Sequence, residues 1–121
     1  MTRDAIIPPA LRAVHDRWHF APAVRAGNLL FCSGIIGTSP DGNPPPTGLA
    51  GAEATTADPD APLTALVAVR DPAAQFATAF EALAAILAVA GAGLDDVVEL
   101  TTYHVEMARH MDTFMQVRAR Y

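Results

Sequence analysis

The first strong hydrophobic pattern in the chain is a short apolar run that follows a turn signal. Leu29–Cys32 is continuously apolar, and its length favours a strand covered on both faces over a helix. Gly27 and Asn28, just before it, tolerate the positive φ that a two-residue hairpin loop needs. Ser33 and Gly34 interrupt the run, and such a pair marks a bulge or a point where something approaches the backbone closely.

The segment before this turn predicts the other strand of the hairpin. Arg17–Val24 reads as a first strand, with Trp18, Phe20 and Pro22 on one face. Because Pro22 cannot donate a ladder hydrogen bond, we expect it at an edge or a bulge. Residues 1–16 contain a Pro-Pro pair and mixed polarity, and we expect an irregular or short helical lead-in.

A long amphipathic helix is predicted in the second half of the chain. Asp71 is a good N-cap, and Pro72 suits the first helical position. Gly91 and Gly93 mark the end of the helix. Apolar residues at helical spacing form one stripe, expected to pack against a sheet: Phe76, Phe80, Leu83, Leu87 and Ala90.

A further strand and helix complete the pattern. After a turn at Asp95-Asp96, Val97–Val105 has apolar residues on both faces, as in a central strand. Met107–Arg120 fits a second helix, with Met111, Phe114, Met115 and Arg118 along one side. The order predicts an α+β fold in which helices cover one face of a sheet.

Residues 38–70 are predicted to be a long loop insertion. Residues 38–62 are rich in Pro, Gly, Ala, Thr and Asp and show no hydrophobic period. Loops of this length are functional lids, disordered segments or tolerated surface insertions, and we favour the insertion. Leu63–Val69 is expected to return as a short strand.

Composition limits the possible classes of function. The 121 residues are 51% hydrophobic and 17% charged, which indicates one globular domain, 1–121. The net charge is −5 and there is no Lys, which disfavours nucleic-acid binding and rules out Schiff-base chemistry by a lysine. We expect no signal peptide, no membrane span and a cytoplasmic location.

The residues most often used in catalysis or metal binding give little indication of a site in this sequence. Cys32 is the only cysteine and is expected to be a small core residue. The four histidines, His15, His19, His104 and His110, are expected at the surface or the edge of the core. Neither a metal site nor a glycosidase-type carboxylate pair is predicted. Ser33 is the best polar candidate, and its simplest role is a hydroxyl bonded to local backbone.

Three segments in register resemble the RidA/YjgF family, also called the endoribonuclease L-PSP family. They are Phe20–Gly37 (FAPAVRAGNLLFCSGIIG), Asp71–Leu83 with its continuation through Gly91, and Leu94–Tyr103. Together they span roughly two thirds of the chain in family order.

The resemblance implies a homotrimer with a chorismate-mutase-like, or ferredoxin-like, α+β fold and no cofactor. It also implies a cleft between subunits that holds a small carboxylate-bearing ligand beside Ser33 and Gly34. Phe20 occupies the position of an aromatic residue, usually Tyr, that closes the cleft, and Met115 occupies a position that is commonly Asn. Several family members hydrolyse reactive imines or enamines to 2-keto acids and ammonia.

The chain departs from the family pattern in ways that leave the function open. It ends at Tyr121, before the final strands and before the family's Arg and Glu that bind the substrate and position water. We expect this sequence to be either part of a longer protein or a short variant that completes its sheet with a borrowed strand. In either case, Arg118 or Arg120 could replace the missing guanidinium. Imine deamination therefore competes with a second hypothesis, a non-hydrolytic protein that binds small molecules or partners through a more apolar cleft. Ribonuclease activity is disfavoured by the acidic charge.

Overall fold

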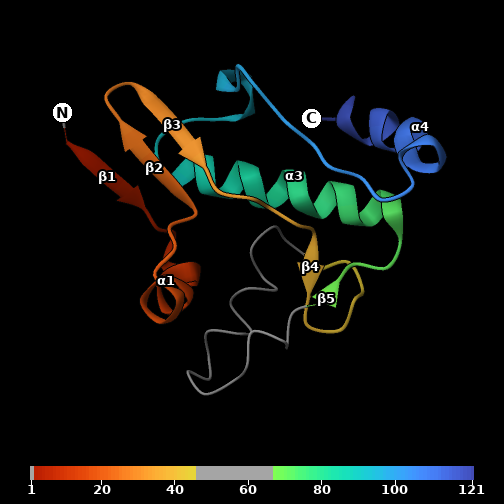
Figure 1. The fold of residues 1–121 in the computed structure, drawn as a ribbon, viewed down its shortest axis with the longest axis horizontal. Helices are drawn as coiled ribbons and strands as arrows, with labels where there is room; N and C mark the ends of the chain where they lie inside the picture. Colours follow the sequence, from red (N-terminus) through yellow and green to blue (C-terminus); the bar gives the residue numbers. More distant parts are fainter. Residues whose placement is uncertain (1, 46–66) are drawn as a thin grey trace.

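The computed structural model describes residues 2–45 and 67–121 and shows an α+β fold of small antiparallel sheets and helices (Figure 1). Its elements are β1 (Arg3–Ile6), η1 (Pro9–Leu11), α1 (Arg12–Trp18), β2 (Ala23–Ala26), β3 (Leu29–Cys32), β4 (Thr38–Ser39), β5 (Val67–Ala68), α3 (Pro72–Val89), η3 (Leu94–Asp96) and α4 (Met107–Arg118). The α+β class predicted from the sequence is confirmed.

The predicted hairpin is present as strands β2 and β3 of a three-stranded antiparallel sheet with the order β1-β2-β3. Its register pairs Ala23 with Cys32 and Ala26 with Leu29, which leaves Gly27 and Asn28 as the loop. Gly27 has φ 62° and Asn28 does not adopt positive φ. Glycine at the first of two loop positions is the type II′ pattern, whose twist matches that of the paired strands.

The prediction of a strand over Arg17–Val24 was wrong for residues 17–22, because β2 begins at Ala23. Residues Arg12–Trp18 form α1, and His19 ends that helix in the left-handed conformation with φ 55°. The alternation of Trp18, Phe20 and Pro22 reflects a helix end followed by an irregular turn. The residues before α1 also include β1, which pairs with β2. This strand was not predicted from the sequence, because residues 3–6 have mixed polarity and no strand pattern.

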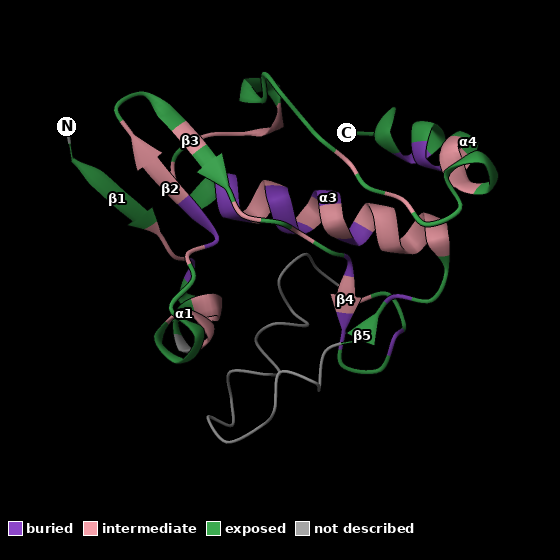
Figure 2. Ribbon diagram, viewed as in Figure 1, coloured by how far each residue is buried: buried purple, intermediate pink, exposed green. Residues whose placement is uncertain are grey.

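The sheet is less covered than the apolar run suggested. Leu29 and Phe31 are 53% and 60% exposed, and Leu30 is the one residue of β3 that is partly covered (Figure 2). Cys32 is also exposed, which corrects the prediction of a core cysteine. Among the described residues, the apolar side chains of β3 are therefore partly exposed to solvent.

The ends of the predicted loop insertion are joined by a second small sheet. Thr38 pairs with Ala68, and Ser39 pairs with Val67, in antiparallel register. The short strand expected within Leu63–Val69 is therefore present at its C-terminal end as β5, while the rest of the insertion, residues 46–66, lies outside the described residues.

Helix α3 begins where its sequence signals place it. The Asp71 carboxylate accepts a hydrogen bond from the backbone N–H of Ala74 at 2.9 Å, and Pro72 is the first helical residue. The helix ends at Val89, and Gly91 follows with φ 78°. By length and composition α3 could cross a membrane, which the sequence analysis did not anticipate. A buried core helix passes the same test, and the central residues of α3 are buried (Figure 2).

The hydrophobic core lies between α3 and α4 rather than between α3 and the sheet. Phe80, Phe114 and Val117 form a buried cluster, and the rings of Phe80 and Phe114 are stacked at 6.0 Å. The ring of Tyr121 stacks on the other side of Phe80 at 5.2 Å. The expected packing of the α3 stripe on a sheet is therefore replaced, for Phe80, by packing against α4 (Figure 1).

Two details of the C-terminal region differ from the sequence prediction. Helix α4 ends at Arg118, and its buried residues are Phe114 and Val117, whereas Met115 is exposed. Residues 97–104 do not form a strand, because no ladder of hydrogen bonds pairs their backbone with another segment in the described part of the chain. The turn before them is the short helix η3.

Candidate functional site

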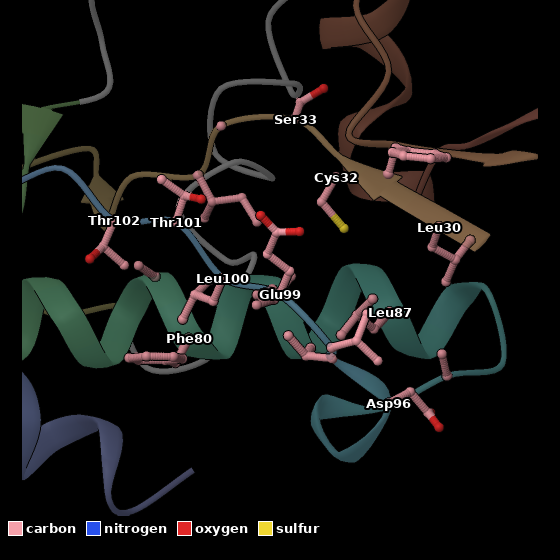
Figure 3. A pocket seen from close by; sticks show the side chains of 18 of the residues that line it. Leu30, Cys32, Ser33, Phe80, Leu87, Asp96, Glu99, Leu100, Thr101 and Thr102 are labelled. Carbon is pink, nitrogen blue, oxygen red and sulfur yellow. The ribbon is translucent and has the colours of Figure 1, made fainter.

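An open groove of about 910 Å³ runs between β3 and the 97–104 segment, above α3 (Figure 3). One wall comes from residues 28–37, the other wall from residues 96–104, and the floor from α3. The floor side chains are mostly apolar: Phe76, Ala79, Phe80, Leu83 and Leu87. The predicted site residues Ser33 and Gly34 lie on the first wall.

The side chains of the two walls alternate between an inner and an outer face. Leu30 and Cys32 of β3 and Leu100 of the other wall point towards α3 (Figure 3). Ser33 and Glu99 point away from the helix, so both present oxygen atoms on the outer face. This alternation follows the two-residue period of extended backbone, and it places the Ser33 and Glu99 oxygen atoms on the face opposite the apolar floor.

Ser33 is held at the rim by two hydrogen bonds to the segment before β2. Its hydroxyl donates to the carbonyl oxygen of Ala21 at 2.6 Å, and its backbone N–H donates to the carbonyl oxygen of Pro22 at 2.9 Å. The simplest role considered for this residue, a hydroxyl bonded to local backbone, is thus realised. The hydroxyl oxygen keeps lone pairs that can accept a hydrogen bond from a ligand.

Gly34 and Gly37 have opposite surroundings. A Cβ atom on Gly34 would meet nothing within 4 Å, and its backbone N–H has no acceptor among the described residues. A Cβ atom on Gly37 would lie 2.0 Å from the carbonyl oxygen of Gln75. The close backbone approach expected near Ser33-Gly34 therefore occurs at Gly37, where the chain crosses the start of α3, and Gly34 leaves an open position beside Ser33.

The groove also contains a guanidinium that sequence reasoning did not single out. Arg25 lines it and donates from Nη2 to the carbonyl oxygen of Ala90, at the C-terminal end of α3. A cation at that end satisfies a free carbonyl group and the negative end of the helix dipole. Arg25 therefore ties the hairpin to α3, and its remaining N–H groups lie at the Ala90 end of the groove.

The other two predicted ligand-binding residues lie outside this groove. Phe20 is 43% exposed and sits next to Ala21, whose carbonyl group binds Ser33. Met115 is 48% exposed on α4. A role for either side chain in a cleft between subunits stays a prediction.

His104 is the histidine that lies at the groove. Its ring packs edge-on against Phe114, with ring centroids 4.7 Å apart, and against Phe76 at 5.5 Å. Its Nε2 atom is buried and has no hydrogen-bond partner in the described part of the chain. Its place beside the aromatic core agrees with the expectation for the histidines.

Cys32 faces the inner side of the groove as a free thiol (Figure 3). Desolvation raises the pKa of this thiol above its ordinary value. A raised pKa leaves less thiolate at neutral pH and makes the thiol a weaker nucleophile. Within residues 2–45 and 67–121, no group of three or more His, Cys, Asp or Glu side chains could hold a metal ion.

Comparisons with known proteins agree with the sequence resemblance. Residues 11–121 match the sequence profile of the family described as Endoribonuclease L-PSP. The chain is 28% identical over 116 residues to the RutC family protein YjgH of Escherichia coli strain K12, covering 96% of this chain and 70% of that protein. It also resembles the solved structure of protein YJGH, at 27% identity and a TM-score of 0.68, covering 99% of this chain and 74% of the other.

Proposed function

Because the chain belongs to the endoribonuclease L-PSP family, which is the RidA/YjgF family, we propose that it hydrolyses reactive 2-imino or enamine acids. Water adds to the imine carbon, the C–N bond breaks, and the products are a 2-keto acid and ammonia. The observation that carries the proposal is the Ser33-Gly34 corner, where a hydroxyl group sits beside an open backbone position at the rim of the groove.

The substrate carboxylate would lie at this corner. The free N–H of Gly34 is a suitable donor to a carboxylate oxygen. The Ser33 oxygen, fixed by its bond to Ala21, can accept a hydrogen bond from the imine nitrogen when that nitrogen carries a proton. No side chain at position 34 would obstruct the approach.

Glu99 is our candidate for the group that positions the attacking water. It lines the same groove and points to the outer face, as Ser33 does (Figure 3). A carboxylate accepts hydrogen bonds from water and can align it for attack on an electrophilic carbon. Glu99 could not be selected from the sequence, because it was one of several polar positions on a predicted alternating strand.

We further propose that the working form is a homotrimer whose cleft lies between subunits. Large apolar side chains stand exposed on the outer face and beyond it, including Phe31, Tyr103 at 93% and Val105 at 84%. Exposed apolar groups of this size favour association with another surface. Phe20 and Met115, both exposed, would complete the cleft from such a surface.

The deaminase proposal is tested by coupling the protein to an amino acid oxidase that generates 2-imino acids. We expect faster ammonia release than in the oxidase reaction alone. Ser33→Ala and Glu99→Gln should each reduce that acceleration, whereas Asp112→Asn, at an exposed position on α4, should not. Ammonia release at the uncatalysed rate with the unaltered protein would refute deamination.

A second function, non-hydrolytic binding of small molecules, is favoured by one specific observation. The Ser33 hydroxyl hydrogen and an N–H of Arg25 Nη2 already donate to backbone carbonyl groups, so fewer donors are left for an anionic substrate. Thermal-shift measurements with small carboxylates and with apolar aromatic compounds distinguish the two functions. A preference for aromatic compounds, without ammonia release, would support binding alone.

A further inference from the structure

The Ser33-Gly34 corner is built from the hairpin and the residues just before it. The Ser33 hydroxyl donates to the carbonyl oxygen of Ala21, and the Ser33 N–H donates to that of Pro22. Strands β2 and β3 continue this unit with no break in their register. The corner therefore moves with the hairpin, and a shift of the hairpin along α3 carries the Ser33 hydroxyl with it.

Glu99 is attached to the molecule in a different way, through the C-terminal end of α3. The connection after the helix is folded back on it, because the N–H of Ala92 donates to the carbonyl oxygen of Leu87 at 2.9 Å. The Asp96 carboxylate then accepts a hydrogen bond from the N–H of Gly93 at 2.9 Å, and η3 packs against α3. The end of α3 therefore sets where the wall that contains Glu99 begins.

Arg25 joins these two units. It lies opposite Leu30 in the register of β2 and β3, and cross-strand partners share one face of a sheet. Leu30 points towards α3 (Figure 3), so Arg25 lies on the face that covers the helix. From there its Nη2 donates to the carbonyl oxygen of Ala90, the C-cap residue of α3. Among the described residues, no other hydrogen bond joins the hairpin to α3 or to the wall that contains Glu99.

This hydrogen bond constrains the hairpin in a way that apolar contact does not. Hydrophobic contact is non-directional, so the inward side chains of β3 permit the hairpin to slide along α3. A hydrogen bond from a charged donor has a preferred length and angle. The Ala90 carbonyl accepts from no backbone N–H in the described part of the chain, and the negative end of the helix dipole favours a cation there.

From these contacts we propose that Arg25 is a positioning residue, which sets the separation of the two walls and thereby the place of Ser33 relative to Glu99. The inference rests on the proposed imine hydrolysis, in which the corner binds the substrate and Glu99 aligns the water. A displacement of about 1 Å between reacting groups can lower a rate by about 100-fold. Because the corner lies within the hairpin, loss of the Arg25 bond should spare substrate binding and slow the attack of water.

The kinetic test compares substitutions at Arg25 in the ammonia assay. Arg25→Met keeps a long apolar stem and removes the donor. We expect its kcat to fall about tenfold while KM changes by less than about twofold. Arg25→Lys keeps a charged donor and should recover part of the lost kcat. Arg3→Gln, at an exposed position on β1, is the matched control and should leave both constants unchanged.

A double substitution separates positioning from a general loss of structure. If Arg25 acts by aligning the walls, Arg25→Met in a Glu99→Gln background should lower kcat by less than about twofold, because the aligned carboxylate is already gone. A tenfold loss in both backgrounds would overturn the positioning role. So would a rise in KM that accounts for the whole loss of kcat/KM.

A distance measurement tests the anchor without any reaction. Nitroxide labels are attached at Phe31→Cys and Val98→Cys, both exposed positions, in a Cys32→Ser background. Labelled chains are diluted with unlabelled chains, so that each measured pair lies within one chain. We expect Arg25→Met to broaden the distance distribution between the walls and Arg3→Gln to leave it unchanged.

The two proposals fail in different ways. An unchanged distance distribution in Arg25→Met would overturn the role of Arg25, whether or not the unaltered protein releases ammonia. A broadened distribution, in a protein that releases no ammonia above the uncatalysed rate, would refute imine hydrolysis and still support Arg25 as the residue that sets the separation of the walls.

Discussion

The helix pair and the sheet edge of this protein illustrate two ways in which apolar sequence is used. In the helix pair, Phe80, Phe114 and Val117 bury one another, and the ladder hydrogen bonds of α3 and α4 run within each helix. At the sheet edge, β3 and residues 97–104 have the sequence of buried strands but lack a partner on their facing edges.

The difference shows for which elements the local sequence is enough to determine the structure. A helix satisfies its hydrogen bonds internally, so a cap and an apolar stripe determine it. A strand needs a neighbour, and that neighbour can come from a distant part of the chain or from another polypeptide. We therefore expect substitutions in the helix pair to cost stability in the 121-residue chain, and equivalent substitutions at the sheet edge to cost little until the edge is paired.

The largest effect is expected for Phe114→Ala. Phe114 is 7% exposed and packs against Phe80, Phe76 and His104. Truncating a buried Phe removes transfer free energy and leaves a cavity, which lowers the free energy of unfolding by about 3–5 kcal/mol.

Phe31→Ala is the matched control for Phe114→Ala, because Phe31 is an equally large side chain that is 60% exposed on β3. Chemical denaturation, at a protein concentration low enough to keep the subunits apart, should show little change for Phe31→Ala, within about 0.5 kcal/mol. A comparable loss for both variants would mean that the outer face of the sheet is covered in solution, and the contrast between the two regions would fail.

The next effect compares two glycines on the segment that leaves β3. A Cβ atom at Gly37 would overlap the carbonyl oxygen of Gln75, so Gly37→Ala must displace backbone at the start of α3. We expect a loss of about 1–3 kcal/mol. Gly34→Ala, for which the added carbon meets open space, should be nearly neutral in thermal unfolding.

A large cost for Gly34→Ala in the described chain would show that another surface contacts this position in solution. Gly34→Ala also separates stability from function. If the Ser33-Gly34 corner binds the substrate, the variant should weaken ammonia release while leaving the melting temperature unchanged.

A smaller effect is expected at the cap of α3. Asp71→Ala removes the acceptor for the Ala74 N–H, and loss of an N-cap costs about 1 kcal/mol. Asp95→Ala, at an exposed position, serves as the control. Urea unfolding measures both, and equal effects would mean that α3 is held by packing alone.

Most of the helical structure could be predicted from the sequence, for reasons that these residues make clear. Asp71 and Pro72 mark the start of α3. Gly91, which follows the last apolar residues of the helix, marks its end. The hairpin was equally readable, because Gly27 permits the turn. Each of these signals acts over a few residues, so no knowledge of distant contacts was required.

The strand predictions were less successful because they depend on partners. Arg17–Val24 has an alternating pattern, yet α1 extends through Trp18, and the polar segment Arg3–Ile6 supplies the strand that pairs with β2. Val97–Val105 has the pattern of a central strand but no strand beside it in the described residues. Periodicity indicates which residues share a face and does not reveal whether a neighbour is present.

The candidate site could be predicted only in part. Ser33 and Gly34 were selected and do lie together at the groove, while Phe20 and Met115 lie outside it. Glu99 was overlooked, because only the fold shows that it shares the outer face with Ser33 (Figure 3). A site formed by segments that are distant in sequence requires their arrangement in space to be known.

The smallest expected effect concerns alkaline pH at the C-terminal end of the helix pair. Desolvation, and then the negative charge of Glu81, raise the pKa of Tyr121 above its ordinary value. Between about pH 10, where an unfolded Tyr loses its proton, and the raised pKa, the folded state holds more protons than the unfolded state. The free energy of unfolding therefore falls as pH rises through this range.

Tyr121→Phe should weaken that alkaline fall, because Phe keeps the ring that stacks on Phe80 and removes the ionisable hydroxyl group. The measurement is urea unfolding at several pH values in a Cys32→Ser background, since the raised pKa of the Cys32 thiol acts in the same direction. The chain contains no Lys, so few other groups titrate in this range. Tyr103→Phe, at a ring that is 93% exposed, is the control. If Tyr121→Phe and its parent lose stability equally, the C-terminal residue is not held against α3 in solution, and the helix pair is less self-contained than the sheet-edge comparison requires.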